Sequence, residues 1–165
     1  EKNPIVLLKA LQSATFDVMV TFCGSNNDEE YKRQFENELA KLPSCVEVKI
    51  IGDIPHSELG SLFLQNDILA LPSLGENFGH AIFESLAFGL PVIIGNNTPW
   101  KDLELKQAGF EIEPTNEAEL LKRITFFNDL SSDIFVDWSL KSQNTAISYY
   151  NENNFEEIYL NLFNA

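Results

Sequence analysis

The stretch from residue 72 to residue 84 holds the residue types best suited to chemistry in this chain. It places two glutamates, Glu76 and Glu84, on either side of Gly79, within the sequence Pro-Ser-Leu-Gly-Glu-Asn-Phe-Gly-His-Ala-Ile-Phe-Glu. The residues after Gly79 have the apolar spacing of a helix that opens at this glycine. The first N–H groups of a helix have no partner inside it, and they form a ready site for an anion. The stretch therefore combines two carboxylates with a group of N–H donors.

The spacing of the two glutamates is weak evidence by itself. The pairs Glu30/Glu38 and Glu111/Glu119 have the same spacing, but no glycine flanks them, and they are typical of solvated helix faces or loop ends. The pair in the 72–84 stretch differs in its context. An aliphatic run and Pro-Ser precede it, a glycine opens the helix within it, and Gly-Leu-Pro-Val-Ile follows it. The candidate site rests on this context.

Apolar runs of strand length alternate with helical patterns along the chain. Three of the runs are almost continuously aliphatic or β-branched, which predicts strands buried on both faces. Alternating strands and helices favour a parallel sheet with right-handed crossovers, hence a doubly wound, Rossmann-like α/β domain. Ligands of such sheets bind beyond the carboxyl ends of the strands, where the 72–84 stretch lies. The expected strands cover residues 17–23, 46–51, 68–71, 92–94 and 110–112.

Several helix starts have a local signal. Thr98 followed by Pro99 predicts an N-cap with proline at the first helical position. Asn116 and Glu119 have the spacing of a capping box, and Ser57 is expected to cap the helix that follows it. Beyond residue 133 the patterns are helical, so the domain is expected to end in helices. The expected helices lie near residues 5–11, 31–42, 59–63, 82–87, 116–128, 134–150 and 155–162.

Length and charge exclude several classes of protein. The chain has 165 residues, 44% of them hydrophobic, so residues 1–165 are expected to form one domain with a filled core. Its formal net charge of −14 argues against a nucleic-acid partner, because a phosphate backbone needs clustered Lys and Arg. Cys23 and Cys45 form no C-x-x-C pattern, which excludes a disulfide framework and favours a reducing cytosol. The sequence has no signal peptide and no apolar run of membrane-spanning length.

The beginning of the chain is unusual for a parallel sheet. Glu1-Lys2-Asn3-Pro4 leads directly into a helical pattern, whereas such sheets normally start with a strand that feeds the first helix. We therefore expect a fragment from which the first strand is missing.

The central motif resembles that of a known family. The run from Leu71-Pro-Ser through Glu76-Asn-Phe-Gly to Glu84-Ser-Leu-Ala-Phe-Gly-Leu-Pro-Val-Ile is similar to the donor-binding, C-terminal half of GT-B retaining glycosyltransferases, above all the group 1 (family 4) set. The resemblance extends over nearly the whole chain. Its Thr-Pro-Trp version, which begins at Thr98, looks like that of bacterial enzymes of capsule or lipopolysaccharide assembly.

The resemblance implies a role for each motif residue. Glu84 would accept hydrogen bonds from the donor ribose, and Glu76 would hold hydroxyls of the transferred sugar. Lys2 would neutralise the leaving diphosphate, so that N–H dipoles and an ammonium stabilise the developing charge without a metal. The remaining donor-binding positions would be the amides of Asn77, Phe78, Gly79 and His80 around the sugar and phosphates, and the turn from Gly52 to Ile54 beneath the base. Apart from the resemblance, Thr98 is a candidate for a phosphate contact, through its hydroxyl or the helix that it would cap.

The sequence also departs from the family pattern. The arginine that normally precedes the lysine is absent, and so is the N-terminal domain that binds the acceptor. The isolated chain is therefore expected to bind its UDP- or GDP-linked donor weakly and to turn over poorly. No cofactor is expected, and the acceptor would be a glycan or a lipid-linked molecule. The resemblance implies a cytoplasmic protein, with at most peripheral association at the inner membrane face through the absent half.

Other functions remain to be weighed against a glycosyltransferase. A non-catalytic nucleotide-binding or interaction module can be built on the same sheet. A receiver domain is disfavoured because no strand-end lysine follows residues 92–94. The sequence lacks the Gly-x-Gly-x-x-Gly signature of a nicotinamide-binding domain, and it has no Asp-x-Asp pair to hold a divalent metal.

The two histidines are weaker candidates. The side chain of His80 is a weaker candidate for chemistry than its amide, and His56 is open between a contact with the base and a place at a helix start.

Overall fold

The computed structural model describes residues 2–25 and 28–152. Each strand lies within two residues of its predicted bounds: β1 (Val18–Phe22), β2 (Val46–Ile50), β3 (Leu69–Leu71), β4 (Val92–Gly95) and β5 (Gly109–Ile112). The helices are α1 (Pro4–Leu11), α2 (Glu29–Leu39), α3 (His56–Phe63), α4 (His80–Ala87), α5 (Leu103–Lys106), α6 (Glu117–Asn128) and α7 (Ser132–Glu152). The helical pattern predicted over 155–162 lies outside the described residues.

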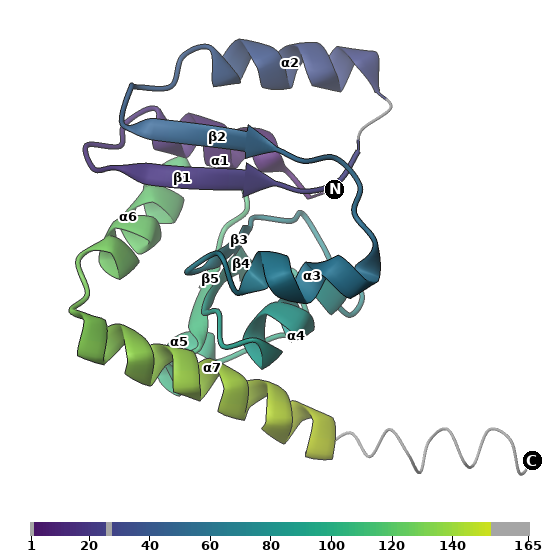
Figure 1. Ribbon diagram of the computed structural model, residues 1–165, viewed down its shortest axis with the longest axis vertical. Coiled ribbons are helices and arrows are strands. Elements are labelled where there is room, and N and C mark those ends of the chain that lie inside the picture. The colour runs from purple at the N-terminus through teal and green to yellow at the C-terminus, as the bar shows by residue number, and fades with distance from the viewer. Residues whose placement is uncertain (1, 26–27, 153–165) are drawn as a thin grey trace, which may run out of the picture.

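All strand pairs in this structure are parallel, which confirms the predicted α/β class (Figure 1). The strands divide into a pair, β1-β2, and a three-stranded sheet in the order β3-β4-β5. The prediction of a single sheet therefore needs refinement. In the doubly wound strand order the first strand lies between the second and the fourth. The division between β1 and β3 falls at that position.

One apolar core nevertheless joins the two sheets. Leu7 and Leu11 of α1 belong to a buried cluster that contains Val46 of β2 and Ile93 of β4. Helix α1 packs on α2 and on α6, so it bridges the two halves. Helices thus cover both sheets, and α1 is the element that fixes one half relative to the other.

Strand β4 separates two faces of the core, as expected for a doubly wound domain. Its four residues are all buried. Ile93 faces the cluster with α1 and α6, whereas Val92 and Ile94 face a second cluster with Leu86 of α4 and Leu103 of α5. The almost purely aliphatic sequence of this strand follows from burial on both sides.

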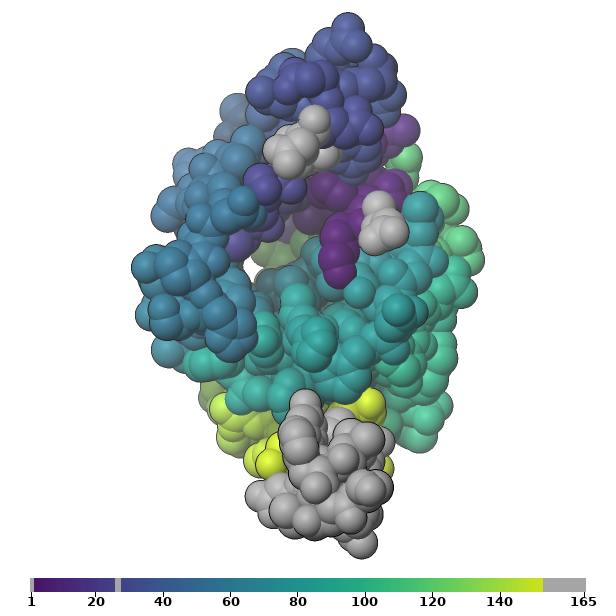
Figure 2. Space-filling view, turned by 90° about the vertical axis from the view of Figure 1, so that its right-hand side faces the viewer, coloured from purple at the N-terminus to yellow at the C-terminus, as the bar shows by residue number. Residues whose placement is uncertain are grey.

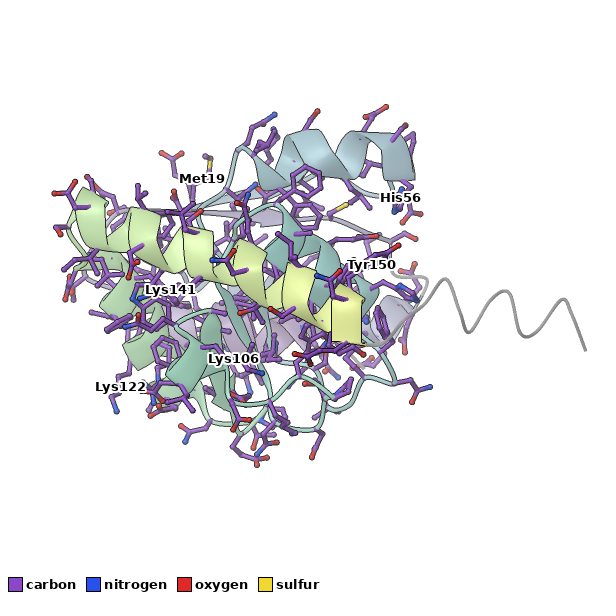
Figure 3. All side chains as sticks on the ribbon, turned by 90° about the horizontal axis from the view of Figure 1, so that it is seen from below. Met19, His56, Lys106, Lys122, Lys141 and Tyr150 are labelled. Atoms are coloured by element: carbon purple, nitrogen blue, oxygen red, sulfur yellow. The ribbon has the colours of Figure 1, made fainter. Side chains whose placement is uncertain are left out.

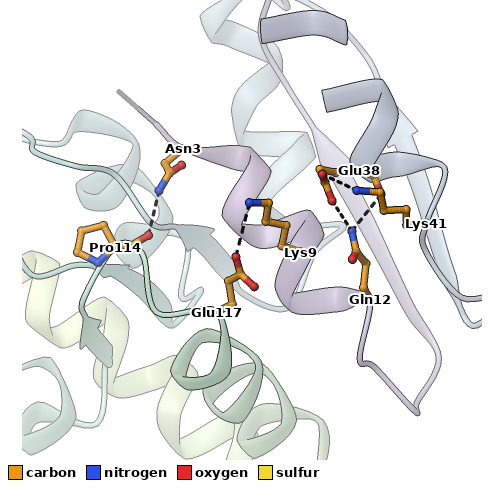
Figure 4. A network of polar contacts seen from close by, with 7 residues as sticks. All are labelled: Asn3, Lys9, Gln12, Glu38, Lys41, Pro114 and Glu117. Atoms are coloured by element: carbon orange, nitrogen blue, oxygen red, sulfur yellow. Dashed lines mark hydrogen bonds and ion pairs between the residues drawn. The ribbon is translucent and has the colours of Figure 1, made fainter. Parts of the chain in front are cut away.

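Polar contacts reinforce the bridge made by α1 (Figure 4). On one side, the Asn3 side-chain amide donates to the Pro114 carbonyl at 2.9 Å, and the Lys9 ammonium lies 3.9 Å from the Glu117 carboxylate. On the other side, the Gln12 amide donates to a Glu38 carboxylate oxygen at 2.7 Å. These contacts place the start of α1, with Lys2 just before it, at a fixed position relative to both sheets.

The predicted helix start is found at α6 but not at α3. Helix α6 begins as expected, because the Asn116 side chain accepts a hydrogen bond from the Glu119 backbone N–H at 3.0 Å. Helix α3 begins one residue before Ser57, with Pro55 at its N-cap position and no side-chain cap, so the capping role predicted for Ser57 is wrong.

The helix predicted from Thr98 is also absent, since α5 begins only at Leu103. The Thr98 hydroxyl instead donates to the Trp100 carbonyl at 3.5 Å. Trp100 is 3% exposed, and burial of this large side chain draws the segment across the domain as a loop.

Helix α7 closes the other end of the domain. It packs on α4 and, more lightly, on α5. Figure 3 shows it crossing the face seen from below, with Lys141 near its middle and Tyr150 near its end. This arrangement supports α4 along its length, and Tyr149 of α7 reaches Phe78 just before the helix begins.

Candidate functional site

The candidate site lies at the edge where the parallel strands end. The loops after β1, β2, β3 and β4 all emerge there, because parallel strands point their carboxyl ends to the same side. Figure 2 looks onto this edge and shows a hollow between the N-terminal residues and the segment that follows β2. The predicted site residues line or adjoin this edge.

Glu76 is held by two donors on one oxygen. Its Oε1 accepts hydrogen bonds from Lys2 Nζ at 2.5 Å and from Ser73 Oγ at 2.8 Å, and its side chain is 11% exposed. Burial raises the pKa of Glu76, but the two hydrogen bonds and the charge of Lys2 outweigh it, so the pKa lies below the usual range. Glu76 is therefore a stable carboxylate with its second oxygen, Oε2, left for a hydroxyl donor.

Lys2 reaches this carboxylate from the other end of the sequence. Its ammonium and Glu76 are 74 residues apart, and its side chain is 57% exposed. Asn3 adopts a left-handed conformation with φ of 55°, and Pro4 opens α1 directly after it. The turn at Asn3 thus sets the position of Lys2. A solvent-accessible ammonium beside a carboxylate is able to meet the phosphates of a ligand.

The loop after β4 holds the loop that carries Glu76. A Cβ on Gly95 would lie 2.0 Å from the Ser73 carbonyl oxygen, so only glycine permits this approach. The Asn97 side-chain amide donates to the Leu74 carbonyl at 3.1 Å, and the Trp100 indole donates to the Phe78 carbonyl at 2.7 Å. The main chain around Glu76 is therefore fixed at several points before any ligand arrives.

Helix α4 begins at the glycine that the sequence indicates. Gly79 is its N-cap residue with φ of 79°, and a Cβ there would lie 2.7 Å from Ile82 Cδ1. The ring of His80 packs on Phe78 at 4.7 Å between centroids. Phe78 also contacts Trp100 and Tyr149, so an aromatic cluster supports the first turn of α4. Asn77 is exposed at the same edge. This turn directs its backbone N–H groups outward as an anion site.

Glu84, on the second turn of α4, has a partner that the sequence did not reveal. Its Oε1 lies 2.8 Å from His56 Nε2, and the Glu84 side chain is 25% exposed. The two residues are 28 positions apart. Packing of α3 on α4, seen also in the stacked rings of Phe63 and Phe88, brings them together. Local spacing gives no signal for such a contact.

The turn predicted to lie beneath a base is placed beside the end of β1. Gly52 has φ of 63°, and its carbonyl accepts a hydrogen bond from the Gly24 N–H at 2.7 Å. Ile54 is half-buried two residues later. Burial, together with the nearby charge of Asp53, raises the pKa of the Cys23 thiol, which lies against the Gly52 carbonyl. The turn therefore continues directly into α3 and His56.

The Thr98 side chain is buried next to the loop that carries Glu76, since the Glu76 N–H donates to the carbonyl of the preceding residue, Asn97, at 3.1 Å. Thr98 is 6% exposed, and its hydroxyl serves the loop that carries Trp100. The structure thus unites Lys2 with Glu76, and Glu84 with the start of α3, and the predicted contact of Thr98 with a phosphate stays a prediction.

Two open surface pockets lie away from this edge. One of about 430 Å³ lies between α1 and α2, beside Lys9 and Glu38, and another of about 390 Å³ lies between Trp100 and α7, beside Lys141. Within residues 2–25 and 28–152, no three His, Cys, Asp or Glu side chains gather in the manner of a metal site.

The fold and this edge together define the class of protein: a doubly wound α/β domain of the GT-B glycosyltransferase type. Residues 1–133 match the family model described as glycosyl transferases group 1. The chain therefore belongs to this family.

A curated relative and two solved structures are similar to this chain, the structures in fold, and each similarity covers part of a longer protein. A D-inositol 3-phosphate glycosyltransferase of Corynebacterium kroppenstedtii is 31% identical over 99 residues, which are 56% of this chain and 22% of that protein. The Anabaena protein Alr3699/HepE, solved with UDP-glucose, superposes with a TM-score of 0.77 at 20% identity over 96% of this chain and 45% of that one. The C-terminal domain of a group 1 family glycosyl transferase (LpcC) from Francisella tularensis gives 0.73 at 18% identity, over 90% of this chain and 80% of that one. The chain thus spans less than a quarter of that curated relative.

Proposed function

We propose that this chain is the donor-binding domain of a glycosyltransferase that uses a nucleotide-diphosphate sugar. The observation that carries the proposal is the contact between Lys2 and Glu76 beside the start of α4. It gathers an ammonium, a carboxylate of lowered pKa and a set of outward N–H groups at one strand-end edge. These are the groups that a sugar linked to a diphosphate requires: acceptors for hydroxyls and donors for phosphates.

Each candidate residue has a role in this proposal. Glu84 accepts hydrogen bonds from the ribose hydroxyls, and Glu76 orients hydroxyls of the transferred sugar. The main-chain amides of residues 77–80 surround the sugar and the phosphates, while the base packs near Gly52 and Ile54. The donor is linked to UDP or GDP. The Anabaena relative, solved with UDP-glucose, supports a UDP-linked donor.

The reaction proposed is retaining and metal-independent. The bond between the anomeric carbon and the diphosphate breaks, and a bond to the acceptor oxygen forms on the same face, with the acceptor proton passing to the departing diphosphate. Lys2 and the N–H groups of α4 stabilise the negative charge on the leaving group. Glu76 acts by positioning the sugar and not as a nucleophile.

The rest of the enzyme is proposed to lie outside these residues. A second domain would bind the acceptor, and a further strand would lie between β1 and β3. Without them we expect the isolated chain to turn over poorly. We propose a glycan or lipid-linked acceptor in bacterial capsule, lipopolysaccharide or exopolysaccharide synthesis; an inositol phosphate, which the curated relatives' names indicate for them, is the competing acceptor.

The proposed compartment is the cytoplasm, including the inner face of the membrane. No helix among the described residues has both the length and the apolar character needed to cross a bilayer. Any membrane contact would come through the acceptor-binding domain.

Calorimetric titration of the chain with UDP, GDP and ADP tests the donor site. We expect one of the three to bind, and Glu84→Ala to weaken that binding by about tenfold or more, since a hydrogen bond to a charged group contributes about 1.5–3 kcal/mol. Glu29→Ala, an exposed glutamate of α2, is the matched control and should leave the affinity unchanged. Binding that ignores Glu84→Ala would contradict the site.

A second measurement, of sugar transfer, distinguishes a catalytic donor domain from a non-catalytic module on the same fold. Glu76→Ala in the full-length protein should abolish most sugar transfer if the domain is catalytic. A non-catalytic module predicts that the biological activity of the full-length protein survives this substitution.

A further inference from the structure

The His56 side chain contacts Glu84 although it is itself hardly packed against the rest of the domain. Its side chain is 82% exposed, yet its Nε2 lies 2.8 Å from Glu84 Oε1. A contact made by so exposed a side chain adds little to stability. The contact is therefore better explained by what it does to Glu84 than by what it adds to the fold.

The contact with His56 occupies one oxygen of the Glu84 carboxylate and leaves the other oxygen available to a ligand. Glu84 Oε1 is engaged with the imidazole, so Oε2 is the oxygen available to a ligand. A glutamate side chain has several rotatable bonds, and fixing one oxygen restricts the direction of the other. Held in this way, the carboxylate is preorganised for a hydroxyl donor at the strand-end edge.

The contact also joins two parts of the proposed nucleoside subsite. His56 opens α3, directly after the turn that contains Gly52 and Ile54, whereas Glu84 lies on α4. At the far ends of the two helices, Phe63 stacks on Phe88 with 5.7 Å between ring centroids. The aromatic pair joins the helices at their carboxyl ends, and the His56–Glu84 pair joins the first residue of α3 to the second turn of α4.

We infer that His56 is a positioning residue of the nucleoside subsite, which acts through Glu84 on the ribose hydroxyls of a nucleoside diphosphate. This inference rests on the proposed function and extends it to a residue outside the family motif. It predicts that His56 affects affinity only where Glu84 and the ribose hydroxyls are both present. A direct contact of His56 with the base or the phosphates would not have this dependence.

Calorimetry with UDP, or with GDP if that is the preferred nucleotide, tests the inference. His56→Ala should weaken binding about fivefold, in line with the loss of one positioned hydrogen bond. His56→Gln keeps an N–H donor at a similar reach and should restore the affinity to within about twofold. Ser57→Ala, the next exposed residue of α3, is the matched control and should bind as the wild type does.

A double-mutant cycle separates positioning from direct contact. In a Glu84→Ala background, His56→Ala should cause no further loss of affinity for the nucleotide. The 2′,3′-dideoxy form of the nucleotide lacks the ribose hydroxyls, so His56→Ala alone should not weaken its binding. A full effect that persists in either case would overturn the inference, as would an unchanged affinity of His56→Ala for the intact nucleotide.

The failure of the inference can be distinguished from failure of the proposed function. Wild-type binding that depends on Glu84 but not on His56 leaves the proposed function standing and overturns the inference. A wild-type chain that binds none of UDP, GDP and ADP overturns both.

Discussion

At the scale of single residues, the two carboxylates of the site are each engaged before a ligand binds. One carboxylate oxygen of Glu76 accepts hydrogen bonds from Lys2 and Ser73, and one carboxylate oxygen of Glu84 lies within hydrogen-bond distance of His56. In both cases the second oxygen remains for a ligand. The partners come from distant parts of the chain, so the site is organised by tertiary contacts and not by the motif alone.

The Lys2–Glu76 pair makes stability depend on pH. Because the pKa of Glu76 is lower in the folded chain than in the unfolded chain, its contribution is fully present above the unfolded pKa and disappears as pH falls through the folded pKa. Lys2→Met should cost about 0.5–1 kcal/mol at neutral pH, discounted for the exposure of Lys2, and nothing once Glu76 is protonated. Urea unfolding at about pH 7 and about pH 3 measures both values.

The control for this prediction removes a lysine elsewhere. Lys32→Met, at an exposed position of α2, lowers the net charge by the same amount. If the two variants lose equal stability at neutral pH, the loss comes from net charge and the specific role of Lys2 is refuted.

At the scale of elements, the loop after β4 supports the loop after β3. The Trp100 indole donates to the Phe78 carbonyl at 2.7 Å, and its ring contacts Tyr149 of α7 at 4.4 Å between centroids. A chain of contacts therefore leads from α7 through Trp100 to the residues just before α4. The site therefore depends on α7, whose Tyr149 contacts both Trp100 and Phe78.

Trp100→Phe tests this support, because it keeps an aromatic ring and removes the N–H donor. The Phe78 carbonyl loses its partner, so we expect a loss of about 1–2 kcal/mol in the free energy of unfolding. We also expect nucleotide affinity to fall about threefold, since the amides of residues 77–80 become less well ordered. Thermal unfolding and calorimetric titration measure the two effects.

Trp138→Phe is the matched control for this variant. Trp138 is 4% exposed within the cluster on the α6 side of the domain. Its replacement should lower stability while leaving nucleotide affinity as it is. An equal loss of affinity in both variants would show that the effect follows general destabilisation and not the Trp100–Phe78 hydrogen bond.

At the scale of the whole molecule, net charge opposes the proposed ligand. The chain carries a formal charge of −14, so the average field repels a nucleoside diphosphate, while Lys2 and the start of α4 attract it at short range. Raising NaCl from about 20 to about 200 mM shortens the Debye length severalfold and screens the long-range repulsion more than the short contacts. We therefore expect the affinity for UDP to rise about two- to threefold over this range.

Calorimetry at the two salt concentrations checks this expectation, with uridine, which carries no phosphate, as the reference ligand. Uridine affinity should change little. A steady fall in UDP affinity with added salt would mean that local positive groups dominate the field at the site.

Features that depend on neighbouring residues could be predicted from the sequence, whereas features that depend on distant contacts could not. The strand runs, the capping role of Asn116 and the helix that opens at Gly79 depend on neighbouring residues, and all of them were predicted correctly. Thr98 and Ser57 also had local cap signals, but burial of Trp100 and an earlier helix start at His56 prevailed. Local preferences at a helix start amount to about 1 kcal/mol, and burying a tryptophan outweighs them.

The sequence by itself determined the α/β class, the order of the elements and the loop that carries the site, because periodicity and glycine-flanked motifs act over short distances. The tertiary structure alone decided that Lys2 meets Glu76, that His56 meets Glu84, and that the strands divide between β1 and β3. These pairings span 74 and 28 residues. They depend on how α1 bridges the two sheets and how α3 packs on α4, which no local pattern encodes.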